Sequence, residues 1–296
     1  MFRASLSVAL LVAATGMTYA QQQEIEWKQT INMPKGQNIP RDRADILGIE
    51  LGDTYDEAKA KVQKLAAEGI QPKAKTMTPA ERAVARMNGE RSGPPPMREE
   101  KRIYNLKAPG ANSSISVSYV QNIQMTRELP TPNGKLADSL TVQFSAPSSG
   151  HQVLGISRSV TYYDQKDQPL ISETLAQLKQ KMKFDPQSIN AGTPKYRFQF
   201  NDGKPFTQTN PTLVSCVPRP DVNDTIYLKT INESGDCDAL MEVNVQTGVS
   251  RDHASTLSFT LADNDRAKAN LTADFAFIND YAKNLQQNTR GAPPKL

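Results

Sequence analysis

The stretch "DILGIELGDTYDEAKAKVQKL", residues 45–65, joins an apolar run to a glycine turn and an amphipathic segment. The apolar run over residues 46–51 is typical of a buried strand. Thr54 and Glu57 form the T-x-x-E pattern of a capping box, which predicts that a helix begins there. Its apolar face would carry Ala58, Val62 and Leu65, and Glu57 and Lys61 would pair on its wet side. The stretch therefore predicts a strand–turn–helix unit.

Such a unit can hold a phosphate, because a helix N-terminus presents free N–H groups and positive potential. Here, however, three carboxylates occupy that end of the predicted helix: Asp53, Asp56 and Glu57. The turn also lacks the glycine-rich phosphate-binding motifs. The two glycines, Gly48 and Gly52, are therefore interpreted as turn residues.

Beyond this unit, short strand-like segments outnumber helical ones. A short helix is predicted over residues 78–89, a longer one over residues 169–184 and a third over residues 265–287, with β-rich segments between them. Strands and helices do not alternate regularly, as a parallel sheet would require. The predicted fold class is α+β, with antiparallel sheets and packed helices.

The order of elements suggests two related modules. We predict a signal peptide over residues 1–20, an extended lead-in over residues 21–44 and a first α+β module over residues 45–150. A second module is predicted over residues 151–286 and a loose tail over residues 287–296.

The N-terminus has the form of a secretory signal peptide. Arg3 precedes an apolar run that is too short to span a membrane, and Thr18 and Ala20 provide small residues before a cleavage point. A periplasmic or secreted location is therefore expected, with no transmembrane segment in the mature chain. The formal net charge of +4 is too small to predict nucleic-acid binding by itself.

Two cysteines, Cys216 and Cys237, are present. In an exported protein such a pair is expected to form one disulfide bond. A redox or catalytic role is the alternative, but the C-x-x-C spacing is missing.

The opening "LGIELGDTYDEAKAKVQKL" resembles the GIxLG openings of small exported bacterial proteins of the SmpA/BamE type and of β-lactamase-inhibitor-protein modules. The segment "LAQLKQKMKFDP" is similar to a helix that follows strands in other uncharacterised proteins of this kind. The resemblance implies small α+β units that serve as scaffolds or protein-binding surfaces. It implies no catalytic residue.

Catalytic and metal-binding patterns are sparse. The two histidines, His151 and His253, lie outside the known nucleophile-elbow and zinc motifs. Acidic clusters beginning at Asp164, Asp221, Glu233 and Asp263 lack the calcium-loop pattern and are interpreted as turns, the last of them as a helix cap. We expect no cofactor and no metal.

Residues 73–107 carry nine Lys or Arg against four Glu. They form either a solvated excursion or a docking surface for an acidic partner or an anionic membrane surface. The candidate docking residues are Lys73, Lys75, Arg82, Arg86, Arg91, Arg98, Lys101 and Arg102.

The function expected is an exported, soluble, non-catalytic binding protein with a protein or cell-envelope partner. The alternative is a periplasmic hydrolase with a site around His151 or His253.

Overall fold

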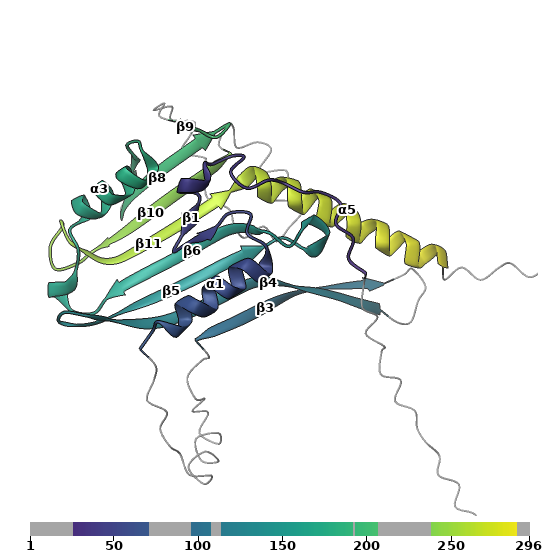
Figure 1. The fold of residues 1–296 in the computed structure, drawn as a ribbon, viewed down its shortest axis with the longest axis horizontal. Coiled ribbons are helices and arrows are strands. Elements are labelled where there is room, and N and C mark those ends of the chain that lie inside the picture. Colours follow the sequence, from purple (N-terminus) through teal and green to yellow (C-terminus); the bar gives the residue numbers. More distant parts are fainter. Residues whose placement is uncertain (1–25, 71–95, 108–113, 192, 207–237, 289–296) are drawn as a thin grey trace, which may run out of the picture.

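One large antiparallel sheet organises the chain (Figure 1). The computed structural model describes residues 26–70, 96–107, 114–191, 193–206 and 238–288. The sheet strands are β3 (Met97–Lys107), β4 (Ser114–Thr131), β5 (Gly134–Phe144), β6 (Val153–Tyr162), β7 (Gln187–Ala191), β8 (Thr193–Asn201), β9 (Lys204–Phe206), β10 (Ala239–Thr247) and β11 (Ala254–Asp263). The α-helices are α1 (Tyr55–Ala67), α3 (Ile171–Met182) and α5 (Asn264–Asn288). The predicted α+β class is confirmed.

The strand order is β3-β4-β5-β6-β11-β10-β8-β7, with β9 paired to β8. Helix α1 is followed in sequence by the meander β3–β6, and α3 is followed by β7, β8, β10 and β11. Pairing of β6 with β11 joins the two meanders into a continuous sheet. Strand β6, placed at the start of the second predicted module, also pairs with β5 of the first. The division into two modules stays a prediction.

The strand predicted over residues 46–51 is wrong in detail. The chain instead forms a tight hairpin of β1 (Asp45–Ile46) and β2 (Ile49–Glu50). Between them Leu47 and Gly48 have φ values of 55° and 78°. Two successive positive φ values reverse the chain as in a type I′ turn, so a continuous strand cannot form.

The main core lies between one face of the sheet and helices α1 and α3 (Figure 1). Helix α1 buries Ala58 and Val62 there, and α3 buries Ile171 and Met182. The strands contribute alternate apolar residues such as Leu140, Val142, Ile156, Met241 and Leu261. Alternation means that the residues between them point to the opposite face of the sheet.

Helix α5 follows β11 directly and packs against the short 3₁₀ helix η2 (Pro147–Ser149) and the start of β6. A bulge leaves Leu154 without a cross-strand partner. Its side chain packs on Ala267 and Leu271 in a second, smaller cluster. This helix therefore docks at the end of the sheet, apart from α1 and α3 (Figure 1).

Several predictions concern residues outside the described part of the chain. These are the signal peptide, the helix over residues 78–89, the bridge between Cys216 and Cys237 and most of the tail predicted over residues 287–296, whose first two residues instead belong to α5. They stay predictions.

Candidate functional site

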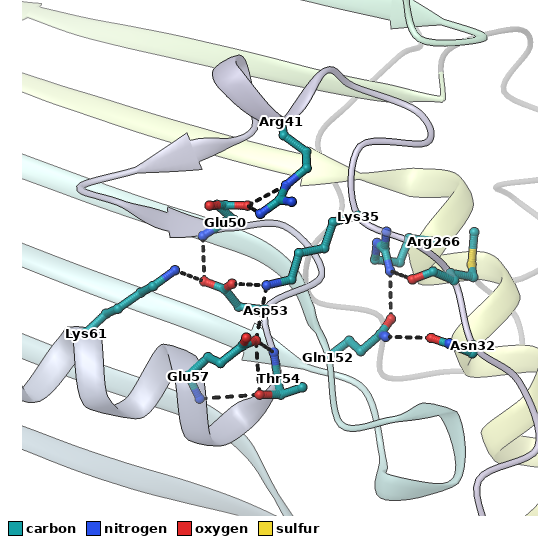
Figure 2. Close-up of polar contacts among 11 residues, drawn as sticks. Asn32, Lys35, Arg41, Glu50, Asp53, Thr54, Glu57, Lys61, Gln152 and Arg266 are labelled. Atoms are coloured by element: carbon teal, nitrogen blue, oxygen red, sulfur yellow. Dashed lines mark hydrogen bonds and ion pairs between the residues drawn. The ribbon is translucent and has the colours of Figure 1, made fainter.

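The turn before helix α1 holds a buried carboxylate between two lysines (Figure 2). Asp53 accepts hydrogen bonds from Lys35 Nζ and Lys61 Nζ, each at 2.6 Å, and from the Glu50 N–H at 2.8 Å. The predicted pair between Glu57 and Lys61 is wrong. Lys61 pairs with Asp53, since a buried charge gains most from a partner, and Glu57 pairs with Lys35.

The predicted capping box is confirmed. Thr54 Oγ1 accepts the Glu57 N–H at 3.4 Å, and Glu57 Oε2 accepts the Thr54 N–H at 2.8 Å. The Thr54 N–H and the Lys35 ammonium lower the pKa of Glu57 because both favour its charged form. Carboxylates therefore already occupy the end of the helix where a phosphate would bind, as the sequence indicated.

Removing this cap should destabilise the protein modestly. We expect Thr54→Ala to lower the free energy of unfolding by about 1 kcal/mol, because the Glu57 N–H loses its acceptor. Chemical denaturation measures the change. Thr54→Ser keeps a hydroxyl acceptor and should retain most of the stability; equal losses in both variants would contradict a capping role.

A second buried polar group, Arg266 at the start of α5, fixes the lead-in (Figure 2). Its Nη1 donates to Met33 O at 2.9 Å and to Gln152 Oε1 at 2.6 Å, and its Nη2 donates to Pro34 O at 2.6 Å. Asp263 accepts the Arg266 N–H at 2.8 Å, so the cap predicted for the last helix is confirmed. With every one of these contacts internal, the network holds the fold together and offers nothing to a ligand.

The structure does not bring the two histidines together. His151 follows η2 and stacks on Tyr55 with ring centroids 4.7 Å apart, whereas His253 bridges to Leu170 at the start of α3. His151 Nε2 lies 2.7 Å from Val120 O, so this nitrogen carries the proton and donates it. Burial lowers the pKa of His151, because the charged ring loses solvation. His151 therefore acts as a neutral, packed aromatic ring.

His253 does have a serine neighbour. Its Nδ1 lies 2.7 Å from Ser250 Oγ, in the turn between β10 and β11. Within the described residues no carboxylate bonds to this ring, and the same hydroxyl also accepts the Asp252 N–H at 3.3 Å. The pair thus resembles a turn-stabilising contact more than an oriented nucleophile and base.

Three of the candidate docking residues lie on the edge strand β3, and an acidic residue pairs with one of them. Arg98 pairs with Glu100 at 2.8 Å, Arg102 lies 5.1 Å from the centroid of the Tyr104 ring, and Lys101 is exposed. The other five (Lys73, Lys75, Arg82, Arg86 and Arg91) lie outside the described residues. The basic docking surface stays a prediction.

The acidic clusters act as turn residues where the structure describes them. Asp164 accepts the Lys166 N–H at 2.8 Å, and Asp167 accepts from Thr131 Oγ1 at 2.6 Å. The clusters that begin at Asp221 and Glu233 fall outside the described residues, apart from Asp238. In the described part of the chain no three His, Cys, Asp or Glu side chains gather closely enough to hold a metal ion.

Sequence reasoning missed the most regular polar feature, which lies on the face of the sheet opposite the main core. Uncharged polar residues stand there in register, forming rows that run across the strands. The first row is Thr126, Ser139, Ser159, Ser258 and Asn244. The second is Gln124, Thr141, Ser157 and Thr260, and a third pairs Thr161 with Thr256. We call these eleven residues the hydroxyl face.

The hydroxyl face is accessible to solvent. Ser139 and Thr126 are exposed, and the other nine residues are partly exposed. Hydroxyls also bond across strands: Ser159 Oγ lies 3.1 Å from Ser258 Oγ, and Thr161 Oγ1 lies 3.3 Å from Thr256 Oγ1. The sequence signal is the polar half of the alternation in "DSLTVQF", "ISRSVTY" and "STLSFTL".

Aromatic rings border the sheet at the β3–β4 end. Trp27 stacks on Phe277 of α5 at 5.4 Å and meets Tyr119 edge-on at 6.0 Å. Tyr104 stacks beside Tyr119 at 6.3 Å. Trp27 and Tyr104 are partly exposed, so this border combines apolar area with polar tips.

Comparison with known proteins identifies no relative: no family model, no curated protein and no solved structure matches the chain. In the described part of the chain, no helix has the length and apolar character needed to cross a membrane. The resemblance to the small exported proteins stays a prediction.

Proposed function

We propose that this protein is an exported, non-catalytic binding protein and that the hydroxyl face is where a partner protein docks. The observation that carries the proposal is the asymmetry of the sheet. One face forms the main core with α1 and α3, whereas the other presents rows of uncharged polar side chains to solvent. The proposed export rests on the form of residues 1–20.

The width of the hydroxyl face suits a protein partner. Its rows cross five strands, from β4 to β10. Strands lie about 4.8 Å apart and the rows extend about 14 Å along β6 and β11, so the face covers about 300 Å². A standard protein–protein interface buries about 800 Å² on each partner, so the face forms the centre of the proposed interface and the partner also contacts residues around it.

Its composition supports the same conclusion. Serine and threonine are short, so ordering them on binding costs little side-chain entropy. The eleven residues carry no formal charge, and the rows end at residues of both signs, Arg98 beside Gln124 and Glu242 beside Thr260. A face without a strong excess of positive charge disfavours nucleic acid and anionic membranes as the partner. The aromatic border at Trp27 and Tyr104 adds residues of the kind that anchor protein interfaces.

The hydrolase alternative has less support. His151 is partly buried and already bonded to a backbone carbonyl, and the contact between His253 and Ser250 has no orienting carboxylate among the described residues. A turnover measured on a hydrolase substrate panel, and lost on replacing both histidines, would favour the alternative.

The proposal can be tested by site-specific crosslinking in the native compartment. A photo-crosslinking residue at position 159, at the centre of the face, should capture a specific protein. The same residue at Gln63, exposed on α1 and on the other side of the sheet, should not. The captured protein is then purified and titrated against the intact chain.

Ser159→Arg should weaken that measured affinity about tenfold or more, because a bulky cation at the centre prevents close packing. The matched control Gln63→Arg should leave it unchanged. Equal binding by Ser159→Arg, or crosslinking only to glycan, would overturn the proposal. Circular dichroism checks that both variants stay folded.

A further inference from the structure

A cavity of about 250 Å³ lies between the β1–β2 hairpin, helix α3 and the core side of the sheet. Met241 of β10, Phe259 of β11 and Leu178 of α3 give it apolar walls. It is on the opposite side of the sheet from the hydroxyl face, because Met241 belongs to the main core cluster and Phe259 packs against that cluster. It is thus a separate site, independent of the proposed function.

Two cations line this cavity, Arg158 of β6 and Lys181 of α3. Arg158 donates from Nε and Nη2 to Asp138, at 2.8 and 3.3 Å. Asp138 is fully buried and also binds Arg127 at 3.0 Å, so two guanidinium groups share one carboxylate. Both bonds to Asp138 leave Arg158 Nη1 unused among the described residues.

Lys181 lines the same cavity. Its Nζ donates to Asp45 O and to Asp45 Oδ1, each at 2.7 Å. Among the described residues Asp45 is the one carboxylate that lines the cavity, and its other oxygen accepts the Gly48 N–H at 3.1 Å. The lysine and this aspartate balance each other, and Arg127 pairs with Glu68 at 2.9 Å as well as with Asp138. Arg158 is therefore the cation that faces the cavity with an unused donor.

Leu47 supplies an independent observation. It occupies the first central position of the hairpin turn with a φ of 55°, where asparagine or glycine is strongly preferred. A leucine there is strained, at a cost of about 1–2 kcal/mol. Its side chain lines the cavity and packs against the main core. Backbone strain in a residue that lines a cavity is a feature often found at ligand sites.

We propose that this cavity binds a small apolar carboxylate. Its chain lies on Met241, Phe259 and Leu47, and its carboxylate faces the guanidinium of Arg158 and the ammonium of Lys181. A planar guanidinium is the group best suited to a carboxylate. The cavity is smaller than the usual range for drug-sized ligands, about 300–1,000 Å³, so a chain of roughly eight carbons is the expected size.

Octanoate is the probe for the test, with octanol as its uncharged counterpart. Calorimetric titration of the full chain should give a dissociation constant between about 10 µM and 1 mM for octanoate, as expected for a ligand of this size. Octanol should bind at least about tenfold more weakly, because it cannot pair with the cations. Equal binding of both probes, or binding of neither, would overturn the proposal.

Two variants locate the site. Lys181→Gln should weaken octanoate binding about tenfold, whereas Lys179→Gln, exposed on the same helix and paired with Asp185, should not change it. Leu47→Asn removes an apolar wall while relieving the strained turn. It should weaken binding without lowering the unfolding midpoint, and full binding by this variant would contradict the assigned wall.

Discussion

Asp138→Asn is expected to lower the free energy of unfolding by about 3–5 kcal/mol, the range measured when one partner of a buried ion pair is removed. Asp138 is fully buried and binds Arg127 at 3.0 Å and Arg158 at 2.8 Å. Arg127 is itself buried, with a side chain only 4% exposed. Neutralising the carboxylate leaves a buried guanidinium whose closest remaining charge partner is the half-exposed Glu68. Urea denaturation measures the loss.

The control is Asp280→Asn, which removes a carboxylate of an exposed pair with Lys283. This change should stay within about 0.5 kcal/mol of the wild type. The losses of stability in two variants of the buried network should also differ in size. Arg158→Met should cost less than Asp138→Asn, because Arg127 still neutralises Asp138. A loss as small as that of the control would contradict the buried network.

Asp274→Asn is expected to remove much of the pH dependence of stability in mildly acidic solution. Asp274 of α5 is buried and accepts the Ala146 N–H at 2.8 Å and the Ser148 hydroxyl at 2.6 Å. Burial raises the pKa of this carboxyl from 3.8 to about 6, although the hydrogen bonds oppose the shift.

The sign follows from proton binding. Between the unfolded pKa of 3.8 and the folded pKa of about 6, the folded state binds more protons than the unfolded state. Stability should therefore fall as pH rises through this window, by about 3 kcal/mol from this group alone. Above the folded pKa the penalty is fully present and constant.

Burial also raises the pKa of Asp263, so variants are compared with one another rather than with a calculated curve. Unfolding measured at several pH values should show the fall in wild type and in Asp280→Asn, which lies exposed on the same helix, and a smaller fall in Asp274→Asn. The same pH profile in all three proteins would show that Asp274 is not buried as described.

Local elements were largely predictable from the sequence. The capping box of Thr54 and Glu57 depends on residues three apart, and both contacts form as expected. The apolar face of the helix at Ile171 and Met182 also follows from spacing alone, and both residues are buried. The hairpin at Leu47 was not predictable, because a leucine with positive φ contradicts local preference and is held by packing.

The buried polar residues were harder to predict from the sequence than the local elements. Arg266, Asn270 and Asp274 recur four residues apart on α5, a pattern that by itself indicates a wet helix face, yet all three are buried. Burial depends on contacts with Met33, Gln152 and Ser148, which lie more than one hundred residues away in sequence. Side-chain type alone cannot indicate such partners.

The sequence by itself determined the α+β class, the self-capped helix and the carboxylates at its N-terminus, because each depends on neighbours a few residues apart. Only the tertiary structure decided the candidate sites. Pairing of β6 with β11 places Ser159 beside Ser258 and so completes the hydroxyl face. The same pairing sets Arg158 beside Phe259 in the cavity. These contacts span about a hundred residues and depend on which strands become neighbours, and the local pattern of a single strand does not specify its partner.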